Sequence, residues 1–484
     1  MGNDGRQNFL ICCIRRAFYL SAAVVVLCVG VTALGKAPVY EDVLIEDVPH
    51  VRQSQDFCGE ACAEMYLGKL GFAIDQDDVF GESGVDPVQG RGCYTADLAR
   101  ALRRIGFKTG DVWYKVAAGE AGKQMQEHFA ALHGDLVKGI PSIVCTHYDG
   151  RAGASEHFRL VLGYDSKTDE LIYHEPAEAM GAYRRMKREK FLELWPLKYE
   201  KKRWTLIRIR LKAGRIKQPR RAVGFTNADY AQHIMGLKKR IPDASFTMVL
   251  QRPFVVAGDE SAFMVRRRAV ATIKWATDKL KQDYFTKDPA EIIDIWLFKD
   301  KGSYGKHTRG IFGESPTTPF GYYSDEHDAL IMNIGTGGGT LVHELVHPFI
   351  NSNFPECPAW FNEGLASLYE QCREKKGRIW GLTNWRLAGL QADIKASRIG
   401  SFRELTHSSD YEFYNGGGDK YAHARYLCYY LQEKGLLVRF YHEFHANRRR
   451  DPTGFESLKK VLGEKDMGSF QKRWEKFVMK LTFP

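Results

Sequence analysis

The segment that most constrains the fold is His343-Glu344-Leu345-Val346-His347, which follows a run of glycines in ALIMNIGTGGGTLVHELVHPF. Residues four apart share one face of an α-helix, so His343 and His347 can present two imidazoles to one metal ion. Glu344 lies beside them, where it can take a proton from a water that the metal polarises. The glycines do not predict a phosphate-binding loop, because no Gly-Lys-Ser/Thr follows them. The segment therefore predicts a helix that carries a metal site.

A catalytic zinc also needs a third protein ligand and an open position. Glu363 follows in CPAWFNEGLASLYEQC, where Pro358 can begin a helix and Glu363 falls on its second turn. We therefore expect two facing helices to supply His343, His347 and Glu363. Pro348 comes directly after His347, disfavours helical geometry there and lacks a backbone donor, so we expect the first helix to kink or end a turn early.

Residues 245–484 resemble the gluzincin metallopeptidases, in particular the peptidase MA-like domains in which HExxH is followed by W-x-x-E-G-x-A. The resemblance implies that zinc binds the two histidines and Glu363, with Glu344 as general base. It also implies that the strand before the glycines pairs with an extended substrate. A later segment, YAHARYLCYYLQEKG, matches the region that supplies a donor to the tetrahedral intermediate, and Tyr421 is the candidate. Core packing of Tyr421 and a metal site without turnover are the alternatives.

A second group of reactive residues lies nearer the N-terminus. In VPHVRQSQDFCGEACAEMYLGKLGF, Cys58 opens a stretch with Ala61, Cys62 and Met65 at helical spacing. A thiol at a helix N-terminus feels the positive end of the backbone dipole, which favours the nucleophilic thiolate. A buried structural cysteine is the alternative.

The segment EHFRLVLGYDSKTDELIYHEP predicts two strands joined by a polar turn. His157 opens the first strand and Glu175 closes the second, so an antiparallel hairpin makes the imidazole and the carboxylate neighbours. With Cys58 supplied by the helix, the three residues could act as nucleophile, general base and orienting group.

Residues 40–213 resemble the C39-like cysteine peptidases, which have a papain-like fold; the likeness rests on the Gln53 to Cys58 stretch, HFRLVLGYD and a strand ending in an acid plus proline. The resemblance implies that Cys58 is the nucleophile, His157 the general base and Glu175 the third member. It further implies that Gln53 helps the Cys58 backbone amide to hold the oxyanion.

Two positions depart from the pattern of that family. The family usually has Asp or Asn where Glu175 stands, and its glutamine usually lies where this chain has Arg52, which leaves Gln53 and Gln55 as alternatives. A degenerate peptide-binding domain is the main alternative to cysteine chemistry, and amidase or transpeptidase chemistry would use the same triad.

The N-terminus predicts export. Ala17–Gly35 is an uncharged run of 19 residues preceded by Arg15 and Arg16, which fits either a cleaved signal or an N-terminal anchor. Beyond it lie seven cysteines, an odd number that allows one free thiol and up to three disulfides.

The net charge of +11 is concentrated in one segment. Tyr183–Arg221 holds 16 Lys or Arg against three Glu, and within it Trp204–Lys212 alternates apolar and basic residues, which predicts a strand with a basic outer face. We expect no nucleic-acid partner, because neither an aromatic-interleaved platform nor zinc-finger spacing accompanies the basic residues.

Taken together, these patterns predict an α+β protein with a papain-like C39 domain followed by a gluzincin metallopeptidase-like domain. We expect an extracytoplasmic peptidase, periplasmic, secreted or membrane-anchored, that binds zinc, acts on a protein or peptide substrate and contacts the membrane through its N-terminal segment if that is uncleaved. A non-catalytic surface protein that binds peptides or cell wall is the alternative. The expected divisions are a leader at 1–36, the C39-like domain at 40–213, a basic linker at 214–244 and the metallopeptidase domain at 245–484.

Overall fold

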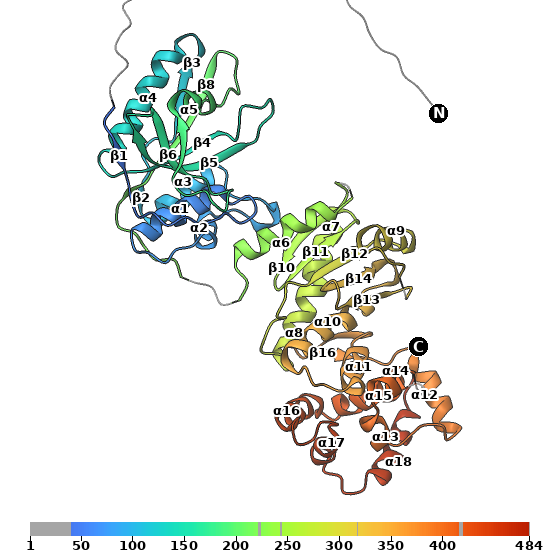
Figure 1. Ribbon diagram of the computed structural model, residues 1–484. Helices are drawn as coiled ribbons and strands as arrows, with labels where there is room; N and C mark the ends of the chain where they lie inside the picture. The colour runs from blue at the N-terminus through green and yellow to red at the C-terminus, as the bar shows by residue number, and fades with distance from the viewer. Residues whose placement is uncertain (1–39, 221–223, 243, 317, 416–419, 484) are drawn as a thin grey trace, which may run out of the picture.

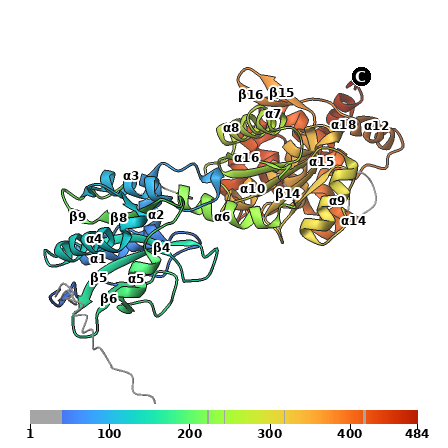
Figure 2. The ribbon, with the colours of Figure 1, turned by 90° about the horizontal axis from the view of Figure 1, so that it is seen from above.

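The computed structural model describes residues 40–483 apart from 221–223, 243, 317 and 416–419. The expected leader at 1–36 lies outside the described residues. Among those that are described, no helix is both long and apolar enough to cross a membrane. Helices and strands are mixed and form two bodies on either side of helix α6 (Asn227–Arg240), as Figures 1 and 2 show. The fold is therefore α+β with more than one domain, as the sequence predicts.

The first domain is built on an antiparallel sheet with strand order β3-β8-β4-β5-β6-β7, with β1 added against β5. Its strands are β1 (Val43–Leu44), β3 (Trp113–Ala117), β4 (Ser142–His147), β5 (Glu156–Asp165), β6 (Glu170–His174), β7 (Arg184–Lys187) and β8 (Arg203–Arg210), and a separate pair is formed by β2 (Phe107–Lys108) and β9 (Lys212–Ala213). Its helices are α1 (Cys58–Lys69), α2 (Gln76–Ser83), α3 (Thr95–Ile105), α4 (Ala121–Leu136) and α5 (Arg188–Leu194).

Both faces of this sheet are covered. Side chains alternate between the two faces of a strand, so neighbours such as Ile143 and Val144 belong to different cores. Ile143 packs with α1, α2 and α3, whereas Val144 packs with α4 and α5. The hairpin predicted from EHFRLVLGYDSKTDELIYHEP is present as β5 and β6.

The expected basic outer face of the strand near Trp204 is wrong. β8 lies inside the sheet between β3 and β4, and α4 covers the face that carries Arg208. Arg208 is only 4% exposed and forms an ion pair with Asp135 of α4, which Arg210 also binds at 2.6 Å. The alternation of the sequence is real, but the basic side chains meet a buried carboxylate instead of solvent.

The second domain has a mixed sheet with strand order β10-β11-β12-β14-β13, in which the two outer pairs are antiparallel and the two inner pairs are parallel. Its strands are β10 (Thr247–Gln251), β11 (Phe254–Gly258), β12 (Asp294–Phe298), β13 (Gly321–Ser324) and β14 (Ala329–Asn333), followed by a separate hairpin of β15 (Cys372–Lys375) and β16 (Arg378–Gly381).

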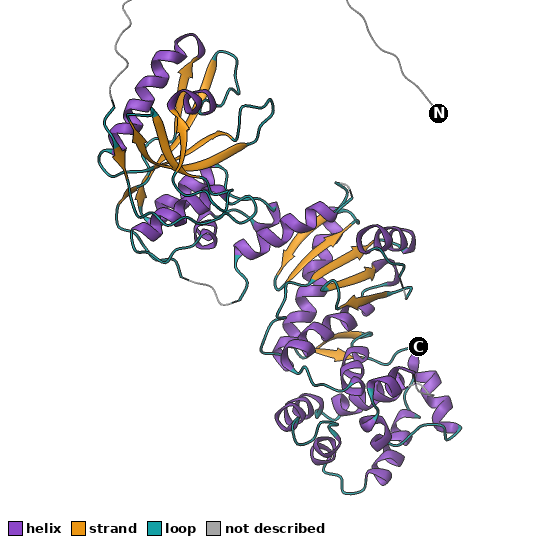
Figure 3. Ribbon diagram, viewed as in Figure 1, coloured by secondary structure: helices purple, strands orange, loops and turns teal. Residues whose placement is uncertain are grey.

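Helices cover both faces of the second sheet and then continue as a helical region to the C-terminus (Figure 3). These helices are α7 (Ala262–Arg268), which runs through a π-helical stretch (Ala269–Lys274) into α8 (Trp275–Asp283), and α9 (Lys301–Phe312), α10 (Gly339–Asn353), α11 (Ala359–Leu368), α12 (Arg386–Lys395), α13 (Phe402–His407), α14 (Asp410–Asn415), α15 (Lys420–Glu433), α16 (Leu437–Asn447), α17 (Phe455–Leu462) and α18 (Met467–Val478).

Helix α10 does not end early at Pro348, contrary to the expectation from sequence. It continues to Asn353 with Pro348 inside it. Proline removes a single helical hydrogen bond, the one to the carbonyl of Glu344. The helix persists because Leu345, Phe349 and their neighbours are fully buried in the core, and burial of an apolar face outweighs one missing bond.

The segment expected as a basic linker contains α6, whose two faces belong to different cores. Ala228, Ala231 and Met235 pack in the core formed by α1, α2 and α3, whereas Tyr230 and Leu237 pack against the sheet of the second domain. A helix buried on two sides joins the domains by packing as well as by the chain.

Candidate functional sites

Cys58 is the first residue of α1, and packing contacts from two other segments fix the turn that precedes it. The ring of Phe57 stacks on Phe80 at 5.0 Å, and Gly92 approaches the turn so closely that a Cβ there would lie 1.9 Å from the carbonyl oxygen of Asp56. The sulfur faces the backbone amide of Phe158, the residue that follows His157 on β5. The turn thus brings the thiol to the strand that carries the predicted base.

The position of Cys58 at a helix N-terminus, which favours the thiolate, is opposed by its burial. Burial raises the pKa of its thiol to about 12, and the amides of Phe158 and Gly59 only partly oppose that effect. The free-energy cost of moving the thiolate charge out of water is larger than the stabilisation that the N-terminus of one helix provides. The group is therefore a neutral thiol at rest, and its attack on a carbonyl would need a base.

His157 and Glu175 are neighbours, and both are buried. His157 Nε2 forms a hydrogen bond with Glu175 Oε1, which also accepts from the backbone N–H of Ala177 at 3.2 Å. Burial alone would raise the pKa of Glu175, but the bond from His157 and the charge of Arg159 hold it below its ordinary value. The carboxylate is ionised and aimed at one nitrogen of the imidazole.

Gln53 lies beside this pair, whereas Gln55 is occupied elsewhere. The backbone N–H of Gln53 donates to the carbonyl of Pro176 at 2.9 Å, and its side-chain Oε1 is buried without a hydrogen-bond partner in the described part of the chain. The carbonyl of Gln55 accepts from Gln232 of α6 at 2.8 Å, and its side-chain oxygen accepts from Lys239. Of the two alternatives, Gln53 is the one whose backbone contacts the segment that follows Glu175.

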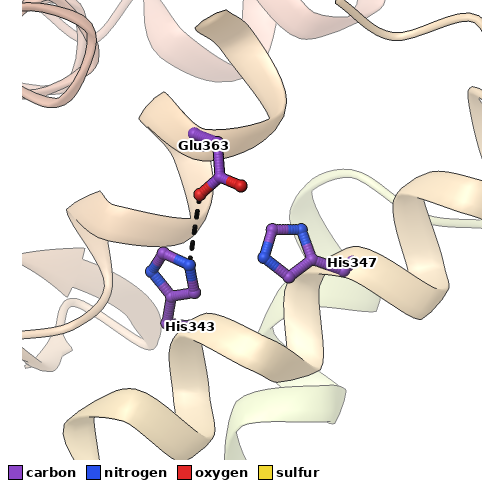
Figure 4. Close-up of side chains that lie close together, drawn as sticks. All are labelled: His343, His347 and Glu363. Atoms are coloured by element: carbon purple, nitrogen blue, oxygen red, sulfur yellow. Dashed lines mark ion pairs between the residues drawn. The ribbon is translucent and has the colours of Figure 1, made fainter. Parts of the chain in front are cut away.

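The second domain brings His343, His347 and Glu363 together, as Figure 4 shows. The histidines project from α10 with ring centroids 5.1 Å apart, and Glu363 faces them from α11, with Oε2 3.3 Å from His343 Nε2. One ligand atom from each residue lies within 4.8 Å of the others. The three side chains could therefore hold one metal ion.

Three polar residues that the sequence analysis missed fix the orientation of this set. Glu370 Oε1 lies 3.3 Å from His343 Nδ1, Asn362 Oδ1 accepts from His347 Nδ1 at 2.9 Å, and Tyr414 donates its hydroxyl to Glu363 Oε1 at 2.9 Å. Asn362 adjoins Glu363, and Glu370 lies two residues beyond the end of α11, so closeness in sequence carried a signal for both. Tyr414 reaches the site by tertiary packing, and no local spacing indicates it.

The charge and donor chemistry of the set fit zinc. Burial would lower the pKa of His343, but the carboxylates of Glu363, Glu370 and Glu344 raise it to about 10. Such a site favours a positive charge. The donors are two imidazoles and a carboxylate, and buried Glu363 Oε2 faces His343 Nε2 at 3.3 Å, an arrangement that suits two ligands of one cation.

Glu344 and Tyr421 line a cleft of about 840 Å³ in front of the histidines, with the glycine loop and the exposed rings of Phe320 and Trp385 around it. Glu344 Oε2 accepts the backbone N–H of Tyr323 in β13 at 3.1 Å, and burial raises its pKa. The strand before the glycines is β14, which lies between β12 and β13 and has no free edge, so the expectation that it pairs with substrate is wrong. The edge strands of this sheet are β10 and β13, and β13 is the one that contacts Glu344.

The comparison with known proteins found a family match in the first domain. Residues 45–202 match the model of the Peptidase_C39 like family. The match spans about a third of the chain, and no family match supports the second segment. No curated protein matches the chain. The match supports a domain at residues 45–202 that is similar to the C39-like peptidases.

Proposed function

We propose that the protein is an exported or membrane-anchored peptidase with two reaction centres, one that uses zinc and one that uses a thiol. The observation that carries the proposal is the convergence of His343, His347 and Glu363 beside Glu344, which lines an open cleft together with His343. The C39-like domain supports peptidase chemistry independently.

In the second domain, His343, His347 and Glu363 would hold zinc. Zinc supplies polarisation of a water molecule and of the substrate carbonyl when it is bound. Glu344 takes a proton from the attacking water and delivers it to the leaving amide nitrogen. Tyr421 is our candidate donor to the developing oxyanion, and the free edge of β13 offers backbone groups to an extended peptide.

The test of the zinc centre combines metal content with cleavage of reduced, alkylated casein. We expect about one zinc per purified chain, lost in His343→Ala. Glu344→Gln should retain zinc but lose casein cleavage by the second domain roughly 10²–10⁴-fold. Glu326→Gln, an exposed carboxylate in the turn after β13, is the matched control. Zinc-free protein with undiminished cleavage would reject this centre.

In the first domain, we propose that Cys58 attacks the substrate carbonyl carbon while His157 removes the thiol proton. The C–N bond breaks, His157 returns the proton to the leaving nitrogen, and water then hydrolyses the acyl-enzyme. Glu175 orients His157, and Gln53 helps to bind the oxyanion. The raised pKa of Cys58 makes this base obligatory, which supports a role for the His157–Glu175 pair.

The two centres should be inhibited separately. A chelator should remove zinc-dependent cleavage only, and Cys58→Ala should remove thiol-dependent acyl transfer only. If Cys58→Ala changes no activity, the first domain binds peptides without cleaving them. Undiminished cleavage by a Cys58→Ala, Glu344→Gln double variant would reject both catalytic assignments, whereas a parent protein that binds peptides or cell-wall stems without cleaving them would support the rival function of a surface protein.

Export is part of the proposal and rests on the apolar run from Ala17 to Gly35. N-terminal sequencing of the protein made in its own cells distinguishes the forms. A mature N-terminus near residue 36 indicates a cleaved signal, and an intact N-terminus with the protein in the membrane fraction indicates an anchor. An intact chain in the cytoplasmic fraction would contradict export.

A further inference from the structure

Arg159 is a buried cation next to the His157–Glu175 pair. It lies two residues after His157 on β5, so both side chains point to the same face of the sheet. Only 5% of Arg159 is exposed, although arginine is almost never buried without a partner. A buried guanidinium requires a reason in the residues that it contacts.

The hydrogen bonds of Arg159 fix the orientation of its guanidinium group. Arg159 Nε donates to Glu175 Oε2 at 2.8 Å, and Nη1 donates to Thr146 Oγ1. Nη1 and Nη2 also donate to the carbonyls of His147 at 3.2 Å and Tyr148 at 2.9 Å. Glu175 is its only carboxylate partner among the described residues, and the neutral acceptors hold the planar fork against the end of β4.

The two oxygens of Glu175 consequently have different tasks. Oε2 receives Arg159, whereas Oε1 receives His157 Nε2. Glutamate has one more rotatable bond than the Asp or Asn usual at this position, so its carboxylate needs an additional restraint to face the imidazole in one way. Arg159 provides that restraint by binding Oε2, the carboxylate oxygen that does not bind His157.

We propose that Arg159 is the positioning residue of the thiol centre: it clamps Glu175 so that Oε1 stays on His157 Nε2 and Nδ1 remains the nitrogen that takes the thiol proton. The inference rests on the proposed cysteine chemistry and deepens it. Arg159 does not touch the reacting atoms, so its effect must pass through Glu175.

Alkylation of Cys58 in the full chain by iodoacetamide tests the clamp without a known substrate. The rate is followed by mass spectrometry of the Cys58 peptide between pH 5 and pH 9. We expect Arg159→Met to slow alkylation at neutral pH about tenfold, a part of the roughly 10²–10⁴-fold contribution of a general base. Arg159→Lys keeps the charge but loses the fork and should recover only part of the rate.

The matched control is Thr146→Val, which removes a neighbouring hydrogen bond of Arg159 but leaves its contact with Glu175. We expect this variant to alkylate within about twofold of the parent if the carboxylate contact is what matters. Equal losses in Thr146→Val and Arg159→Met would show that Arg159 only fastens the end of β4, and would overturn the proposal.

A double-variant cycle decides whether Arg159 acts through Glu175. In a Glu175→Ala background, Arg159→Met should have no further effect, because the carboxylate that it positions is gone. Losses that multiply would overturn the proposal. His157→Ala separates failure of the proposed cysteine chemistry from failure of the Arg159 proposal. If His157→Ala leaves the alkylation rate unchanged, the triad itself is rejected. If the rate depends on His157 but Arg159→Met does not alter it, only the role of Arg159 is rejected.

Discussion

At the scale of single residues, both candidate centres follow the same principle: a histidine is aimed by a carboxylate that is itself held by an arginine. In the second domain, Glu370 faces His343 Nδ1 and is bound by Arg386 Nη2 at 2.9 Å, and Asn384 donates to it at 3.0 Å. Burial would raise the pKa of Glu370, but His343 and Arg386 lower it to about 2. The carboxylate therefore stays ionised at any pH at which the histidines bind metal.

Glu370→Gln should weaken zinc binding without removing a ligand. Loss of the charge lets the His343 ring turn and makes it a poorer donor, so we expect the zinc dissociation constant to rise roughly 10–100-fold. Competition with a fluorescent chelator measures it. Glu374→Gln is the control, since that carboxylate lies on the exposed hairpin and bonds Trp275. Equal zinc affinity in Glu370→Gln and the parent would contradict the orienting role.

At the scale of elements, the junction of α10 and α11 depends on the glycine run. The first turn of α10 lies so close to the end of α11 that a Cβ on Gly339 would be 2.2 Å from the carbonyl oxygen of Glu370. A Cβ on Gly338, the preceding residue, would meet nothing nearer than Thr272 Cγ2 at 3.7 Å. The run thus lets the metal-binding helix approach the residue that orients it.

Gly339→Ala should therefore destabilise the second domain by about 1–3 kcal/mol, the usual cost of overpacking, and weaken zinc binding by displacing Glu370. Gly338→Ala should change neither property appreciably. Chemical denaturation and zinc titration of the two variants measure the difference. The close approach would be refuted by equal stability of the two variants.

A second prediction concerns His423, which is enclosed in the helical region. Its ring lies 5.0 Å from Phe402 and 5.2 Å from Trp474, and burial lowers its pKa to about 3. The folded state keeps it neutral, whereas the unfolded state binds a proton below about pH 6.5. Its contribution to stability is therefore complete above pH 6.5 and is lost as the pH falls toward 3.

His423→Leu should make the protein less sensitive to acid. Between pH 7.5 and pH 5 the parent should lose about 1.5–2 kcal/mol more stability than this variant. Urea denaturation at several pH values measures the difference, and His407→Ala, at an exposed histidine, is the control. A difference between parent and His423→Leu that does not change with pH would contradict the prediction.

The elements show what the sequence could predict. The helical period alone predicts that His343 and His347 are neighbours, because they lie one turn apart on the same helix. Strand pairing alone predicts that His157 and Glu175 are neighbours, because a single turn connects their two strands. Tyr414, Arg208 and the free edge of β13 depend on which segments pack together, and spacing along the chain carries no such information. The neutral state of Cys58 was missed for a related reason, since burial is a property of the assembled fold.

At the scale of the whole molecule, the basic stretch that dominates the net charge is partly paired with carboxylates of the first domain. Arg185 binds Asp165 at 2.7 Å, Arg188 binds Asp169 at 2.7 Å, and Arg208 and Arg210 share Asp135. The two domains meet through α6, where Lys239 and Gln232 also bind Gln55, close to Cys58.

Two residues on opposite sides of α6 test whether the helix belongs to both domains. Met235 is buried with the helices of the first domain and Leu237 with the sheet of the second. Each change to alanine should cost about 2–4 kcal/mol by leaving a cavity, but in different cores. In hydrogen exchange, Met235→Ala should expose amides of α1 to α3, and Leu237→Ala those of β11 and β12. If both variants loosen the same domain only, α6 is not shared, and the link from the second domain to the Cys58 turn rests on the surface bonds to Gln55 alone.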